Sequence, residues 1–255
     1  MTGPAGGRFD LTGKVAAVTG GSRGLGRAMV LGFAAAGADV VIASRKLDTC
    51  EALAAEVREH FGRRALAVAC HVGRWDDCDR LVDAVYDEFG RCDVFVNNAG
   101  MSPLYPDLVS VSEELYDKTL AVNLKGPFRL GALVGARMAA GDGGSIVNVS
   151  SAGAQSPGAG ELPYACAKAG LLALTVGLAE AYAPKVRVNS LVPGPFATDV
   201  SGSWGDDIEA RFPAMLGRVG RPEEVVGAAL YLASDASSFM TGAQLRVDGG
   251  YTKHV

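Results

Sequence analysis

The sequence predicts a single α/β domain, in which a doubly wound and mainly parallel sheet of seven strands carries helices on both faces. Short β-branched runs alternate with longer helical patterns along the whole chain, as in successive βαβ units. The strand runs are almost continuously apolar, which is typical of strands covered on both faces. No tandem repeat or linker interrupts the sequence, so residues 1–255 are predicted to form one domain.

The expected elements follow from these runs and from the residues that bound them. Pro222, followed by Glu223 and Glu224, suits the first turn of the last helix, and Pro163 suits the first turn of the helix before it. The seven expected strands lie at 14–20, 38–44, 65–71, 92–98, 144–150, 186–192 and 244–250. The helical patterns lie at 24–36, 46–61, 75–89, 112–139, 163–183 and 222–234.

The composition, with 49% hydrophobic and 20% charged residues, predicts a globular protein with a large core. The net charge of −4 and the lack of a basic tract argue against nucleic acid or an anionic membrane as partner. Residues 1–9 lack the apolar core of a signal peptide and are expected to form a flexible tail. No uncharged apolar run approaches the ~18 residues of a membrane span. We therefore expect a cytoplasmic protein.

The five cysteines are scattered and form no C-x-x-C pair, which fits reduced thiols rather than a disulfide framework or a metal site. Cys166 lies between Tyr164 and Lys168, which are considered below as catalytic residues. One interpretation of Cys166 is therefore a reactive thiol. The favoured interpretation is a small residue on a packed helix. No metal is expected in the site.

A glycine-rich segment, "TGGSRGLG" at 19–26, joins the first strand to the first helix. Glycines at such a turn let the backbone approach a pyrophosphate closely, and the helix N-terminus adds N–H groups and partial positive charge. The spacing differs from the G-x-G-x-x-G fingerprint, but its position between strand and helix predicts a dinucleotide site. The cofactor contacts expected from this loop are Gly20, Ser22, Arg23, Gly24, Leu25 and Gly26.

Further motifs follow the glycine loop in a fixed order along nearly the whole chain. They are "NNAG" (97–100), "VNLKGPF" (122–128), "NVSS" (148–151), "YACAK" (164–168), "VPGPFAT" (192–198) and "DGG" (248–250). Together they resemble the classical short-chain dehydrogenase/reductases, from about Asp10 to Gly250. The resemblance implies a Rossmann-type fold and hydride transfer with a nicotinamide cofactor.

Tyr164 and Lys168 are expected one turn apart on one face of a helix. A free phenol has a pKa of about 10 and exchanges protons poorly at neutral pH. A nearby ammonium favours the phenolate, so we expect Lys168 to bring Tyr164 closer to the range of general acid–base catalysis. Tyr164 would then deliver the proton to the oxygen that hydride transfer leaves negatively charged.

The resemblance implies two further catalytic residues. A serine thirteen residues before the tyrosine holds the carbonyl oxygen, and here this is Ser151, with Ser150 as its neighbouring rival. Asn123 matches the residue that anchors a water between Lys168 and solvent. The alternative for Asn123 is an asparagine that hydrogen-bonds within its own helix.

The resemblance also implies cofactor contacts beyond the glycine loop. Asn97 would line the adenosine ribose, and Lys168 would bind the nicotinamide ribose as well as tune Tyr164. At His71 the family usually has an aspartate or asparagine against the adenine amino group, so His71 either hydrogen-bonds there or faces solvent. The remaining implied contacts are Val72, Asn98, Ala99, Gly100, Tyr164, Val192, Pro193, Gly194 and Thr198.

The end of the second strand predicts the choice of cofactor. An NAD site places a carboxylate there to accept hydrogen bonds from the ribose 2′-hydroxyl. This chain has Ser44 and Arg45 instead, and no carboxylate before Asp48. A hydroxyl and a guanidinium suit a 2′-phosphate, which Arg23 could also reach. We therefore expect NADP(H), with NAD(H) as the alternative. The competing interpretation is that Arg23 and Arg45 are solvated loop residues that contact no phosphate.

The substrate is expected to be a small carbonyl compound or secondary alcohol, covered by a lid over residues 195–217. Tyr105, Phe196, Trp204, Phe212 and Met215 offer apolar surface near it. The segment "AAGDGG" (139–144) lacks the basic residues expected for an acyl-carrier-protein substrate, which weakens that alternative.

A cofactor-binding regulatory protein and an epimerase or dehydratase are the other functional hypotheses. A regulatory protein would not need Ser151, Tyr164 and Lys168, and an epimerase would more often carry a larger substrate domain. The helices at 112–139 and 163–183 are apolar around most of their circumference, so they are expected to pair between subunits in a dimer or homotetramer.

Overall fold

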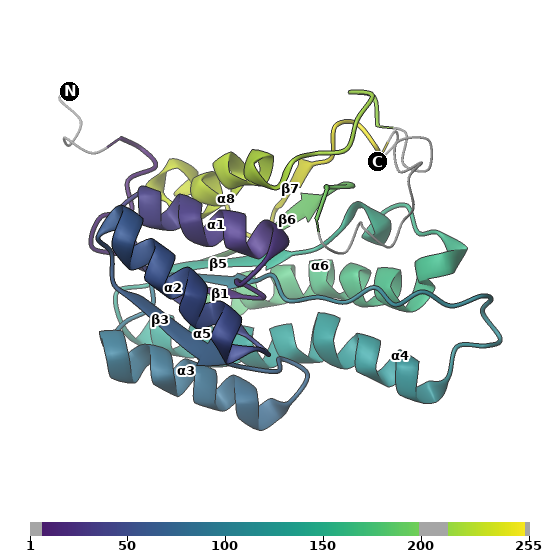
Figure 1. The fold of residues 1–255 in the computed structure, drawn as a ribbon, viewed down its shortest axis with the longest axis horizontal. Coiled ribbons are helices and arrows are strands. Elements are labelled where there is room, and N and C mark those ends of the chain that lie inside the picture. The colour runs from purple at the N-terminus through teal and green to yellow at the C-terminus, as the bar shows by residue number, and fades with distance from the viewer. Residues whose placement is uncertain (1–6, 199–213, 253–255) are drawn as a thin grey trace.

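The computed structural model describes residues 7–198 and 214–252. It contains one sheet of seven parallel strands in the order β3-β2-β1-β4-β5-β6-β7, with helices on both faces (Figure 1). The predicted fold class is confirmed. The strands are β1 (Val15–Thr19), β2 (Asp39–Ser44), β3 (Ala65–Ala69), β4 (Val94–Asn97), β5 (Gly144–Val149), β6 (Val186–Pro193) and β7 (Gln244–Val247).

The helices lie between the strands as predicted, except for one interruption described below. The α-helices are α1 (Gly24–Ala35), α2 (Leu47–Phe61), α3 (Trp75–Phe89), α4 (Glu113–Leu120), α5 (Gly126–Ala140), α6 (Leu162–Tyr182) and α8 (Val226–Ala233). The shorter helical turns are η1 (Ala121–Lys125), η2 (Ala152–Ala154), η3 (Ala159–Glu161), η5 (Pro222–Val225) and η6 (Asp235–Ser237).

Two apolar clusters fill the space between the sheet and its two helical layers. One contains Phe33 of α1 and Leu232 of α8, and the other contains Leu81 of α3 and Leu130 of α5, all fully buried. Successive strand residues point to opposite faces, so β1 contributes Ala16 and Val18 to the first cluster and Val15 and Ala17 to the second. The sheet is therefore buried on both sides, which explains its continuous apolar runs.

The strand order reverses between β1 and β4, and this places two loops side by side. From β1 the chain proceeds outward to β3, and it then returns to lay β4 on the other side of β1. In open α/β sheets, ligands bind at the carboxyl ends of the strands where the order reverses. Here that point lies between the glycine loop after β1 and the "NNAG" segment at the end of β4.

The helix expected at 112–139 is interrupted, which the sequence analysis did not predict. Residues Ala121–Lys125 form a π-helical turn between α4 and α5, in which the N–H of Gly126 bonds to the carbonyl of Ala121. Pro127 explains the interruption, because it has no N–H for the carbonyl of Asn123 and its ring would collide with that carbonyl in a regular helix. The turn brings Asn123 into the interior, where it is fully buried.

Helix α6 is the one helix among the described residues with the length and apolarity to cross a membrane. The span runs from Ala159 to Tyr182 and contains Lys168, and 44% of its 18-residue window is buried inside the structure. Cys166 is exposed on this helix, so the expectation of a packed residue is corrected. The other four cysteines are buried.

Residues 1–6 of the expected tail and residues 199–213 of the expected lid, including Trp204 and Phe212, lie outside the described residues. Phe196 is buried at 5% exposure and packs against Gly220, so it belongs to the core and not to a substrate surface.

Candidate active site

The glycine loop has the shape of a phosphate cradle. Gly20 and Gly24 have φ angles of +63° and +52°, which residues with a Cβ rarely adopt. A Cβ on Gly26 would lie 2.2 Å from the carbonyl oxygen of Gly20, so α1 packs directly on the loop. The first turn of α1 contains no acidic residue, and its N-cap, Arg23, makes no capping bond with its side chain. Its positive N-terminal end therefore fits a pyrophosphate.

The "NNAG" segment forms the second side of this phosphate cradle. Asn98 donates to the carbonyls of Thr19 and Gly20 at 2.9 and 3.2 Å, and the N–H groups of Asn98 and Ala99 donate to the Thr19 hydroxyl. The side chain of Asn98 thus shapes the loop. Asn97 points the other way, is buried, and donates to Asn148 at 2.9 Å, so its expected ribose contact is corrected.

The segment after β6 returns to the glycine loop. The N–H of Gly194 donates to Val247 at 3.0 Å, and a Cβ on Gly194 would collide with Asp248, which explains the glycine. A Cβ on Gly24 would lie 3.4 Å from Cβ of Thr198, so Thr198 lies over the loop. Pro193, the last residue of β6, is buried. Pro193, Gly194 and Thr198 therefore border the same space as the cradle.

The structure brings Ser151, Tyr164 and Lys168 together at the start of α6. The side chain of Ser151 lies beside the Tyr164 hydroxyl, close enough to lower the pKa of the phenol. The ammonium of Lys168 lies 5.7 Å from the centre of the Tyr164 ring and donates to the carbonyl of Val149 at 2.7 Å. Lys168 is 3% exposed, so its charge is held inside the protein.

The two neighbouring serines have different partners. Ser150 is buried and donates to the carbonyl of Lys168 at 3.0 Å, which ties β5 to α6. Ser151 accepts from the N–H of Gly153 at 3.1 Å and faces the Tyr164 hydroxyl. Of the two hydroxyl groups, that of Ser151 is the one placed beside the candidate acid.

Asn123 joins the π-helical turn to the loop after β4. Its amide donates to the carbonyls of Met101 and Thr119 at 2.8 and 2.9 Å, and its oxygen accepts from the N–H of Met101 at 3.2 Å. A Cβ on Gly100 would lie 3.0 Å from this oxygen and 3.6 Å from the Lys168 ammonium, so Gly100 separates the two side chains. The side chain of Asn123 therefore holds the loop after β4 in place. The backbone carbonyl of Asn123 receives no helical hydrogen bond from residue 127, because Pro127 has no N–H.

The pKa values of this group are set mainly by burial. Burial raises the pKa of Tyr164 to about 12, although the hydrogen bond from Ser151 opposes the shift, and Glu161 adds to it. Burial also lowers the pKa of Lys168 to about 8. The expectation that Lys168 lowers the pKa of Tyr164 is corrected for this structure, because the ammonium is turned to Val149 and the loss of hydration dominates.

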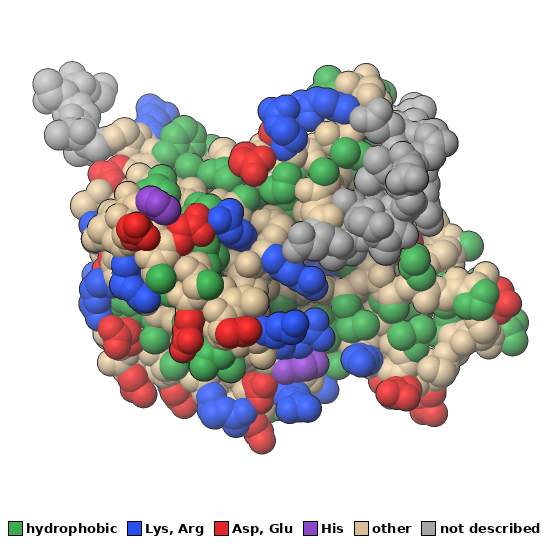
Figure 2. All heavy atoms as spheres, viewed as in Figure 1, with side chains coloured by type: hydrophobic (Ala, Val, Ile, Leu, Met, Phe, Trp, Pro, Cys, Tyr) green, Lys and Arg blue, Asp and Glu red, His purple; other side chains and the backbone are tan. Residues whose placement is uncertain are grey.

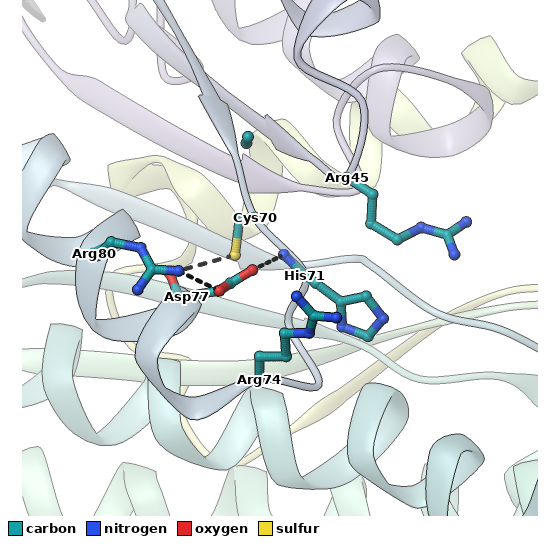
Figure 3. A pocket seen from close by; sticks show the side chains of 7 residues that line it. Arg45, Cys70, His71, Arg74, Asp77 and Arg80 are labelled. Atoms are coloured by element: carbon teal, nitrogen blue, oxygen red, sulfur yellow. Dashed lines mark hydrogen bonds and ion pairs between the residues drawn. The ribbon is translucent and has the colours of Figure 1, made fainter.

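The ends of β2 and β3 border a separate part of the surface. Ser22 of the glycine loop donates to Ser44 at 3.0 Å, and Ser44 donates to the carbonyl of Lys46. Arg45 lines a cavity of about 430 Å³ together with residues that follow β3 (Figure 3). Arg23 is not among its lining residues. Val72 is 7% exposed and packs against Gly126, so little of its surface is free for a cofactor.

Comparison with known proteins agrees with this geometry. The family model described as enoyl-(acyl carrier protein) reductase matches residues 20–252. The chain is 39% identical to L-rhamnose 1-dehydrogenase (NAD(P)(+)) of Azotobacter vinelandii, covering 94% of this chain and 97% of that one. This chain belongs to the short-chain dehydrogenase/reductase family. It is thus an oxidoreductase of a family that uses nicotinamide cofactors.

Two further relatives of this short-chain dehydrogenase/reductase have different cofactors. The NAD-dependent glycerol dehydrogenase of Listeria innocua is 35% identical, with 96% of each chain covered. The gluconate 5-dehydrogenase of Burkholderia cenocepacia, solved with NADP and tartrate, is 32% identical with a TM-score of 0.92, covering 97% of this chain and 98% of that one. Membership of the family therefore leaves open the choice between NAD and NADP.

Sequence reasoning missed the part that Tyr105 plays in this site. Its hydroxyl donates to the carbonyl of Ala159 at 2.6 Å and accepts from the N–H of Leu162 at 2.7 Å, so it holds the start of α6. From the sequence Tyr105 is expected on the substrate surface, and the structure places its hydroxyl at the start of α6 instead. A tyrosine in a loop carries no sequence signal for a bond to a helix start more than fifty residues away.

Proposed function

We propose that this protein transfers a hydride between NADP(H) and a carbonyl compound or secondary alcohol, with Tyr164 as the general acid and base. The observation that carries the proposal is the contact of Ser151, Tyr164 and Lys168 beside the glycine cradle. When bound, the cofactor supplies or accepts the hydride. The protein's residues bind it, orient the substrate and move the proton.

The hydroxyl groups of Ser151 and Tyr164 would both hydrogen-bond to the substrate's carbonyl oxygen. A phenol whose pKa is raised to about 12 stays protonated at neutral pH and can donate as negative charge develops on that oxygen. Lys168, whose pKa is lowered to about 8, can share protons with its surroundings near neutral pH. Reduction therefore ends with the proton of Tyr164 on the product's oxygen.

The substrate proposed here is a polyol or a sugar-derived carbonyl compound. The relatives described above are named for rhamnose, glycerol and gluconate, all of which carry several hydroxyl groups. A panel of ketones, sugars and polyols, followed by nicotinamide absorbance with both cofactors, tests this. Cofactor binding without turnover of any member would favour a regulatory cofactor-binding protein instead.

The preference for NADP(H) rests on Arg45, which lies beside Ser44 and has no ion-pair partner among the described residues. The substitution Arg45→Asp is expected to weaken NADP(H) binding at least tenfold and to leave NAD(H) binding within about threefold, because it removes a charge-assisted contact of about 1.5–3 kcal/mol. Fluorescence titration of wild-type and variant protein with both cofactors measures this. Equal affinities of the wild-type protein for the two cofactors would contradict the assignment.

We also propose that α4, α5 and α6 form a subunit interface. A cavity of about 370 Å³ is lined by residues of these helices and of the π-helical turn η1, namely Leu120, Leu124, Lys125, Phe128 and Leu174. Phe128 and Val176 are 48% and 53% exposed. Apolar surface of this kind marks an interaction site. Light scattering at micromolar concentration is expected to give a dimer or tetramer, whereas Phe128→Asp is expected to shift it toward the monomer. A monomeric wild-type protein would refute the interface.

A further inference from the structure

The cavity beside Arg45 differs in charge from the rest of the protein. Its lining residues are Arg45, Ala69, Cys70, His71, Arg74, Asp77 and Arg80. Three arginines thus face one carboxylate, in a protein whose net charge is −4. Figure 2 shows basic side chains gathered around a histidine on the face in view. This local excess of positive charge needs a specific explanation.

Only part of this charge is neutralised within the protein. Asp77 accepts from the backbone N–H of His71 at 2.9 Å and forms an ion pair with Arg80. In Figure 3 these two side chains lie together on one side of the strand end. Arg45 and Arg74 make no hydrogen bond or ion pair through their side chains within 7–198 and 214–252. Their charges are the ones left available to a ligand.

His71 adds a third donor to the same space. Its Nδ1 accepts from the N–H of Gly73 at 3.2 Å, so a neutral ring carries its proton on Nε2. The ring and the Arg74 side chain line the same cavity, and Figure 3 shows Arg45 extending toward it from the end of β2. The free groups of the cavity are therefore all donors, which suits an anion with several acceptor oxygens.

We propose that Arg74 and His71 are specificity residues that bind the cofactor's 2′-phosphate together with Arg45. The inference rests on the proposed use of NADP(H) and extends it to residues after β3. Arg45 follows β2 and Arg74 precedes α3, so the two guanidinium groups approach a phosphate from different elements. Two planar donors held apart can bind different oxygens of one phosphate, and the His71 N–H can reach a third.

Titration calorimetry with 2′,5′-ADP and with 5′-AMP tests this, because the two probes differ only in the 2′-phosphate and both lack the nicotinamide. The substitution Arg74→Ala is expected to weaken binding of 2′,5′-ADP about tenfold while binding of 5′-AMP stays within twofold. His71→Phe keeps a ring but removes the donor, and it is expected to weaken 2′,5′-ADP selectively by about threefold.

Arg80→Ala is the matched control, since it removes a charge from the same cavity wall that is already paired with Asp77. It should affect both probes by the same small factor. If Arg80→Ala lost as much affinity for 2′,5′-ADP as Arg74→Ala, the loss would reflect the net charge of the cavity and not a specific contact of Arg74. That result would overturn the proposal. Equal weakening of both probes by His71→Phe would remove His71 from the phosphate site.

The outcomes separate this inference from the proposed function. If wild-type protein binds 2′,5′-ADP and 5′-AMP equally, the preference for NADP(H) fails and this inference fails with it. If the wild-type protein prefers 2′,5′-ADP and Arg74→Ala keeps that preference, only the inference fails.

Discussion

The substitution Tyr164→Phe is expected to lower kcat by about 10²–10⁴-fold and to leave cofactor affinity within about threefold. The variant keeps the ring, which packs beside Lys168, but loses the hydroxyl that lies beside Ser151 and would donate the proton. Steady-state kinetics on the best substrate of the panel, together with a cofactor titration, measure the two effects. A variant that retains most of its turnover would show that another group supplies the proton.

The two serines provide a matched pair for the same experiment. Ser151→Ala removes the hydroxyl beside Tyr164 and is expected to lower kcat strongly with little loss of stability. Ser150→Ala removes the buried bond to the carbonyl of Lys168, so it is expected to lower the free energy of unfolding by about 1 kcal/mol. The reverse pattern would assign the catalytic hydroxyl to Ser150.

The substitution Lys168→Met is expected to abolish turnover and to stabilise the fold at neutral pH. Burial lowers the pKa of Lys168 from 10.5 to about 8, so the charged form disfavours the folded state at pH 7 by up to roughly 3 kcal/mol. Loss of the bond to Val149 offsets about 1 kcal/mol. The net gain in the free energy of unfolding is therefore about 1–2 kcal/mol.

The stabilisation expected for Lys168→Met should depend on pH. Because the pKa is lower in the folded than in the unfolded state, the penalty is fully present below about pH 8 and disappears as the pH rises toward 10.5. Urea unfolding at pH 7 and pH 10, at one protein concentration, should show the advantage of Lys168→Met shrinking at the higher pH. An advantage that grows with pH would contradict the assigned shift.

The strands were predictable because burial on both faces leaves an apolar run in the sequence. The strand predicted at 244–250 is three residues too long at its C-terminal end. Strand β7 ends at Val247, and Gly249 and Gly250 have φ angles of +61° and +79°, which do not fit an extended strand. The interruption of the helix at 112–139 was not predicted. Its signal was present in Pro127, but a proline near a helix can also mark a first turn.

The candidate site was predictable in its residue types and less so in their orientation. Asn97 and Asn98 are adjacent in sequence, yet they point to opposite sides, and the point where β4 ends decides which one faces the cradle. The pKa of Tyr164 depends on where the Lys168 ammonium points, which spacing along a helix does not determine. Arg74 has no sequence signal, because only the fold places it opposite Arg45.

The π-helical turn at Ala121–Lys125 also accommodates one extra residue without changing the direction in which the next helix faces. Each residue of a regular α-helix turns the chain by about 100°, whereas this wider turn spreads an additional residue over nearly the same rotation. Leu130 and Val134 therefore still face the sheet. An insertion or deletion within α5 itself would instead rotate every residue after it by about 100°, so we expect changes of length to be tolerated at the turn and not beyond it.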